Sequence, residues 1–149
     1  MTEFDIEKCI SKLKEKRKAF VSEADFQIEL GWVIKEIYPD YKVRLEYPAP
    51  FNPDMHIDIW ILTDAGIIPI ELKYKTKGCR KVIENEIYFL KNHGAKDINC
   101  YAYLKDLERI ETIKEKTSNF LEGYTVFVTN DISYTRNHLK RIASIRIFQ

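Results

Sequence analysis

The sequence predicts an α/β domain in which helices flank a central mixed β-sheet. Apolar residues recur at helical spacing near the start of the chain, and three extended segments follow, two of them joined by a tight turn. A further helical stretch then precedes a short buried strand. The predicted order is α-α-β-β-β-α-β. Because a helix connects the third strand to the last one, we expect those two strands to run parallel.

Length and composition exclude several classes of protein. The 149 residues contain no internal repeat and no linker, so we expect residues 1–149 to form one domain. A hydrophobic content of 45% is too high for a disordered chain. The net charge of +1 excludes a strongly basic, tail-driven nucleic-acid binder, although a local basic groove is compatible with it.

The same composition predicts a cytoplasmic protein that binds no membrane. No apolar run approaches the roughly 20 residues that span a bilayer. The highly charged residues 1–18 do not resemble a signal peptide. Cys9, Cys79 and Cys100 are odd in number and widely separated, so we expect reduced thiols and neither a disulfide framework nor a zinc site.

Two helices are predicted before the sheet. Thr2 is the expected N-cap of the first helix, in which Ile6, Ile10 and Leu13 recur at helical spacing. Ser22 is the expected N-cap of the second helix, which Pro39 ends. The apolar stripe of the second helix comprises Phe26, Leu30, Val33, Ile34 and Ile37.

Glu23 and Gln27 lie at the edge of that apolar stripe when residues are placed at 100° intervals. One interpretation is that the acidic first turn complements the helix dipole, which is common on exposed helices. The other is that this edge of the helix faces a polar site. The sequence leaves both interpretations open.

The later elements follow from alternation and helical spacing. Strands are predicted at residues 42–47, 55–63, 66–74 and 124–129, a short strand or hairpin within 81–90, and a helix over 94–116. Asp64-Ala65 joins the second and third strands into a hairpin, and Gly123 is expected to close the helical region. After Asp131 the tail is basic, with Arg136, His138, Lys140, Arg141 and Arg146.

The hairpin brings polar residues onto one of its faces. With the turn centred on residues 64–65, Asp58 lies directly opposite Glu71, with Cβ atoms about 5 Å apart. Lys73 is two residues beyond Glu71, so it shares that face and lies opposite His56. The other face is uniformly apolar and must pack under a helix; it carries Ile57, Ile59, Ile61, Ile68, Ile70, Leu72 and Tyr74. On the polar face, Trp60 is expected to pack under the second helix.

Two opposed carboxylates repel each other, and a divalent cation relieves the repulsion. Mg²⁺, with Mn²⁺ as the alternative, prefers such oxygen ligands, and Glu23 is a candidate outer ligand. Lys73 could orient or deprotonate an attacking water, or neutralise charge on a phosphate. The other interpretation is that Asp58, Glu71 and Lys73 form the wet side of a half-exposed hairpin. Against it, Asp is depleted in strand interiors, and residues 67–72 are unusually apolar for a surface strand.

These residues resemble the PD-(D/E)xK nuclease superfamily, which has the restriction-endonuclease-like fold. The resemblance lies in Asp58 on the second strand, Glu71-Leu72-Lys73 on the third, and Glu23 in the preceding helix. It covers roughly residues 20–130, with the N-terminal helix and the basic C-terminal tail as additions. The motif is short and degenerate, so the element order is part of the resemblance. The chain is also similar to small uncharacterised prokaryotic members.

The resemblance implies roles for individual residues. Asp58 and Glu71 would bind Mg²⁺, Lys73 would assist the attacking water, and Glu23 would support the metal shell. The literal Pro-Asp pair is Pro53-Asp54, four residues before Asp58. The predicted register places Asp54 opposite Lys75 and away from Glu71, so Asp58 is favoured and Asp54 is held in reserve.

Further residues are candidates for substrate contact. Lys75, Lys77 and Arg80 continue beyond Lys73 and could line a phosphate track, with Gln27 and His56 also facing the site. A solvated loop is the alternative for the basic residues. The run of alternating charge over residues 106–116, which includes Arg109, is interpreted as a salt-bridged helix surface that carries no function.

The sequence thus predicts a magnesium-dependent endonuclease that acts on DNA. The alternatives are a catalytically inactive nucleic-acid-binding or assembly subunit of the same fold, and a purely structural α/β domain. Because little sequence remains after Asp131 for target recognition, a homodimer or a partner subunit is one way to supply it.

Overall fold

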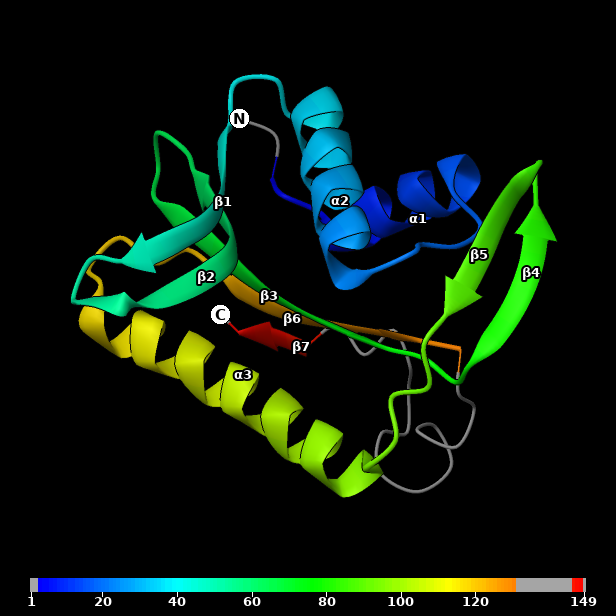
Figure 1. Ribbon diagram of the computed structural model, residues 1–149. Helices are drawn as coiled ribbons and strands as arrows, with labels where there is room; N and C mark the ends of the chain where they lie inside the picture. Colours follow the sequence, from blue (N-terminus) through cyan, green and yellow to red (C-terminus); the bar gives the residue numbers. More distant parts are fainter. Residues whose placement is uncertain (1–2, 131–145, 149) are drawn as a thin grey trace.

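The computed structural model describes residues 3–130 and 146–148 and has the predicted α/β class (Figure 1). Helices α1 and α2 cover one face of a mixed sheet, and helix α3 covers the other. None of the helices among the described residues combines the length and the apolar character that a membrane span requires. The basic residues of the predicted tail between 131 and 145 lie outside the described residues.

The two N-terminal helices form where they are predicted. In α1 (Ile6–Lys16) the N-cap is Asp5, whose side chain accepts a hydrogen bond from the amide of Lys8. Thr2, the predicted cap, lies outside the described residues. In α2 (Glu23–Ile37) the predicted cap is confirmed, because the Ser22 hydroxyl accepts from the amide of Asp25.

The main sheet has the strand order β1-β2-β3-β6-β7. The long strands are β1 (Lys42–Ala49), β2 (Asn52–Leu62), β3 (Ile67–Lys75) and β6 (Gly123–Thr129), and the short β7 (Arg146–Phe148) lies at the edge. Strands β3 and β6 are parallel and the other neighbours antiparallel, as the crossover predicts. The crossover helix α3 (Lys96–Lys116) ends at Thr117, and Gly123 begins β6 instead of closing the helix.

A separate hairpin lies between β3 and α3. Strands β4 (Cys79–Ile83) and β5 (Glu86–Leu90) pair only with each other among the described strands. The hairpin stands at one end of the molecule beside α1 (Figure 1), and its Tyr88 is buried there. The ambiguous segment at residues 81–90 is therefore part of a hairpin extension.

The predicted register of the β2–β3 hairpin holds for four pairs of residues, from Leu62–Ile67 to Ile59–Ile70. The amide of Thr63 donates to the carbonyl of Gly66 at 2.8 Å, which closes the turn at the predicted position. The ladder then stops. Asp58 and Glu71 are the next residues on the two strands, at the point where regular pairing ends.

The two faces of the sheet bury two different cores. Ile59, Ile61 and all four predicted apolar residues of β3 pack under α1 and α2. Trp60 instead packs with Ile110 and Ile113 of α3, so its predicted position under the second helix is wrong. Trp60 and Glu71 lie on the same face of the sheet, and α3 covers that face. Ile57 also packs in this second core, which corrects its predicted place beside Ile59.

The side chains of β1 change face at the same level as those of β2 near Ile57. Val43 and Leu45 lie beside Gly31 of α2, whereas Tyr47 stacks on Trp60 with ring centroids 5.2 Å apart. Between them Glu46 has a positive φ of 52°, a conformation that interrupts the alternation of side chains along a strand. In the β1–β2 register Glu46 falls opposite Asp58, so both strands change face at one place.

Gly66 fixes the turn that sets this register, and its substitution tests that role. A Cβ atom on Gly66 would lie 2.1 Å from the backbone oxygen of Asn119, so the backbone must move to admit it. We expect Gly66→Ala to lower the free energy of unfolding by at least about 2 kcal/mol in urea denaturation. Gly94→Ala is the matched control, because a Cβ there meets nothing within 4 Å. Equal urea midpoints for the two variants would contradict this explanation.

Candidate active site

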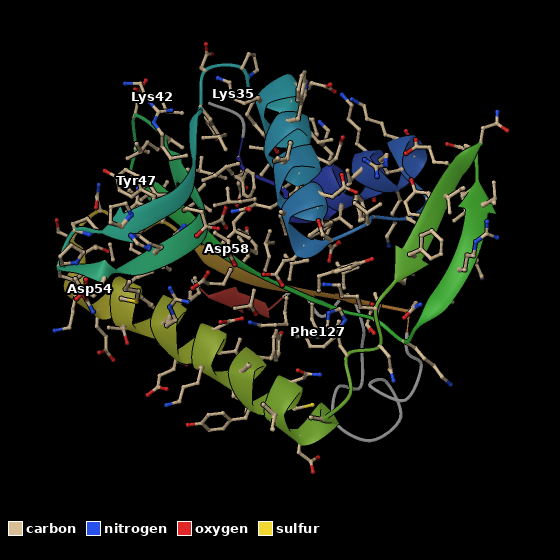
Figure 2. The ribbon with its side chains drawn as sticks, in the orientation of Figure 1. Lys35, Lys42, Tyr47, Asp54, Asp58 and Phe127 are labelled. Carbon is tan, nitrogen blue, oxygen red and sulfur yellow. The ribbon has the colours of Figure 1, made fainter. Side chains whose placement is uncertain are left out.

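The candidate site lies where β2 and β3 separate, with Asp58 near the centre of the molecule (Figure 2). Hydrogen bonds from backbone amides to side-chain carboxylates take the place of the backbone ladder there. The amide of Leu72 donates to Asp58 Oδ2 at 2.6 Å, and the amide of Asp58 donates to Glu71 Oε2 at 3.2 Å. Asp58 and Glu71 therefore lie close together, through contacts between each side chain and the backbone of the opposite strand. The directly opposed pair that the register predicts is not among the paired residues of β2 and β3.

Side chains from other elements accept hydrogen bonds along the edge of β3 that β2 leaves unpaired. Alternate amides of a strand point to the same side, so Leu72, Tyr74 and Thr76 all face the gap that β2 leaves. The amide of Tyr74 donates to Glu23 Oε2 at 2.8 Å, and the amide of Thr76 donates to His93 Nδ1 at 2.9 Å. Glu23 thus reaches β3 from the first turn of α2, as the interpretation of a polar site requires.

Gln27 joins α2 to the other side of the gap. Its side chain is buried and donates from Nε2 to the carbonyl of Asp58 at 2.7 Å and to Glu46 Oε1 at 2.9 Å. Of the two interpretations of this helix edge, the contacts of Gln27 favour the one in which the edge faces a polar site. Glu46 is a site residue that the sequence analysis missed, because simple alternation along β1 does not reveal its left-handed backbone.

Helix α3 contributes two ion pairs to the site. Lys73 Nζ lies 3.1 Å from Asp106 Oδ2, and Arg109 Nη1 lies 2.8 Å from Glu71 Oε1. Arg109 Nη2 also donates to the backbone carbonyl of His56. The predicted salt-bridged surface over residues 106–116 is therefore wrong for Asp106, which is buried, and Arg109 forms its ion pair with β3. A signal was present, since Asp106 falls on the stripe of buried α3 residues formed by Asn99, Tyr103, Ile110 and Ile113.

Burial controls the acidity of the carboxyl groups. Glu71 is only 1% exposed, and burial followed by the charge of Asp58 raises its pKa, while Arg109 lowers it. The pKa of Asp58 is also raised by burial, and the hydrogen bond from the amide of Leu72 opposes the rise. Burial likewise raises the pKa of Asp106, with Lys73 acting against it.

Several predicted pairs do not form because the strands separate. His56 pairs with Pro48 of β1 and is exposed, and it does not lie opposite Lys73. Asp54 is exposed on the β1–β2 hairpin, well away from Asp58 (Figure 2), and its predicted position opposite Lys75 is wrong. Lys75 pairs with Thr129 of β6 instead.

The predicted basic track leads away from the site toward the β4–β5 hairpin. The amide of Lys77 donates to Asn130 Oδ1 at 2.7 Å, and the Lys77 side chain is exposed. Arg80 lies over the ring of Phe89, with its guanidinium carbon 5.5 Å from the ring centroid. These cations are accessible, and they lie outside the group of side chains around Asp58.

Asp58 and Glu71 are the residues that could hold a divalent cation. Within residues 3–130 and 146–148, no group of three or more His, Cys, Asp or Glu side chains is arranged as a metal site. Two carboxylates nevertheless fit Mg²⁺, which commonly takes one or two, plus water and a substrate phosphate. Glu71 Oε1 also fits a cation, because this buried oxygen accepts no hydrogen bond in the described structure and has Arg109 as its ion-pair partner.

The raised pKa of Glu71 predicts how metal-free stability depends on pH. Burial and Asp58 raise this pKa from 4.5 to about 9, so the folded state holds the proton more tightly than the unfolded state. Stability is therefore lost as pH rises between these values, and Glu71→Gln removes that loss. With a chelator present, we expect the free energy of unfolding from urea denaturation to be about 1 to 3 kcal/mol higher for Glu71→Gln than for wild type near pH 9. The two proteins should differ little near pH 4, and a difference independent of pH would contradict the assignment.

No family model matches the chain, and neither the curated proteins nor the solved structures contain a match to it. Any function must therefore be argued from the residues of the site and from their geometry.

Proposed function

We propose that this protein hydrolyses phosphodiester bonds of DNA in a magnesium-dependent reaction, on a fold of the restriction-endonuclease type. The observation that carries the proposal is the meeting of Asp58 and Glu71 where β2 and β3 separate, with Lys73 next on the same face of β3. A cytoplasmic location accords with the three cysteines, which form no disulfide.

Each side chain has a role that follows from its contacts. Asp58 and Glu71 would hold Mg²⁺, which supplies a water of lowered pKa and neutralises charge on the phosphate. Lys73, held 3.1 Å from Asp106, donates hydrogen bonds toward the attacking water or a phosphate oxygen. Glu23 and Gln27 keep the edges of the two strands apart, through Tyr74 and the carbonyl of Asp58.

The accessible cations suit a polyanionic substrate. Lys77 and Arg80 are exposed beyond the end of β3, and Lys75 is partly exposed. Cations along a groove bind phosphates without reading sequence. We propose a homodimer or a partner subunit as the source of sequence recognition.

Isosteric substitutions test the assignment of Asp58 and Glu71. We expect Asp58→Asn and Glu71→Gln each to lower the rate of Mg²⁺-dependent plasmid nicking by at least about 100-fold, because each removes a charged ligand. Asp54→Asn is the matched control, because it removes a carboxylate of the same strand that is exposed and distant. Wild-type rates in either site variant, with circular dichroism showing a folded protein, would contradict the assignment.

A second candidate function is a nucleic-acid-binding or assembly subunit that has lost catalysis. It is favoured by the two α3 ion pairs, which engage both Glu71 and Lys73. Calorimetry separates the two functions. The nuclease predicts heat on titration with MgCl₂ that Asp58→Asn abolishes, whereas the binding subunit predicts DNA binding with no metal-dependent heat.

A further inference from the structure

Helix α3 neutralises the Glu71-Leu72-Lys73 segment with two charges placed one turn apart. Asp106 pairs with the ammonium of Lys73, and Arg109 pairs with the carboxylate of Glu71. Asp106 and Arg109 are three residues apart on the helix and so lie on one side of it, and Glu71 and Lys73 are two apart on the strand and so share a face. Each charged residue of the helix therefore meets a residue of opposite charge on the strand. The pairing therefore links α3 directly to the candidate active site.

Arg109 occupies a particular oxygen of Glu71. The other oxygen, Oε2, accepts from the amide of Asp58, which leaves Oε1 for a cation. Arg109 Nη1 lies 2.8 Å from Oε1, and Glu71 is 1% exposed, so the guanidinium holds a position that a second cation cannot share.

The surroundings of Arg109 allow it to leave. Its side chain is 33% exposed, in contrast to the 9% of Asp106, so it can turn toward solvent without opening the core. Its second anchor is the backbone carbonyl of His56, on the part of β2 that has diverged from β3. Arg109 thus bridges the gap between the strands and is the most accessible member of the two ion pairs.

We propose that Arg109 is a resident counter-cation that positions Glu71 in the metal-free protein and must be displaced before Mg²⁺ binds there. This inference rests on the proposed function. Once displaced, Arg109 remains beside the gap between β2 and β3, where it can contact a phosphate oxygen in the fork geometry that guanidinium groups favour. The ion pair between Arg109 and Glu71 therefore lowers the affinity of the site for metal.

Calorimetric titration with MgCl₂ tests the proposal without measuring activity. We expect Arg109→Gln to bind Mg²⁺ about tenfold more tightly than wild type, because it removes a positive charge next to the cation. Lys105→Gln is the matched control: it removes a charge from the same helix, but one that is exposed and paired with Glu108. Its affinity should equal that of wild type. All proteins are titrated at the same pH, because protons compete with Mg²⁺ for the carboxylates.

The outcomes distinguish failure of this inference from failure of the proposed function. Binding by wild type with equal or weaker binding by Arg109→Gln would overturn the inference alone. Absence of binding heat in all the proteins would overturn both. If Arg109→Gln fails to fold, Arg109→Lys replaces it, because one ammonium cannot span Glu71 and the His56 carbonyl as the guanidinium does. Binding a few times tighter than wild type is then expected, and unchanged affinity would overturn the inference.

Discussion

The separation of β2 from β3 is the constraint on which the rest of the structure depends. Past the Ile59–Ile70 pair, the edge of β3 exposes amides that must find acceptors, since unpaired buried amides are costly. Carboxylates of Asp58 on β2 and of Glu23 on α2 accept hydrogen bonds from two of these amides. The same carboxylates then serve two purposes, because they close the edge of a strand and remain available to a cation.

Buried acids need compensation, and α3 provides it. One ionised carboxylate in such a place is unfavourable, which is why the pKa of Glu71 rises and why a guanidinium lies beside it. Asp106 compensates Lys73 in the same way. The crossover helix therefore does more than join two parallel strands, because its charged residues balance the charges of β3. The stability of the fold then depends on the charge of Glu71 and Lys73.

Local rules predicted much of this arrangement from the sequence. The cap at Ser22 and the turn near Gly66 depend on short-range chemistry, so the second helix and the hairpin register followed directly. Side-chain alternation cannot show which helix covers which face, and Trp60 was therefore assigned to the wrong one. Periodicity also assumes a continuous ladder, so the left-handed Glu46 and the contacts of Arg109 were not predictable from it.

Diffraction from crystals soaked in Mn²⁺ tests whether Asp58 and Glu71 bind a divalent cation together, because anomalous scattering locates the ion without reference to activity. We expect one strong peak at about 2.1 Å from carboxylate oxygens of both Asp58 and Glu71. We also expect the guanidinium of Arg109 to have moved away from Glu71. Crystals that take up the ion elsewhere, with Arg109 still paired to Glu71, would contradict both expectations.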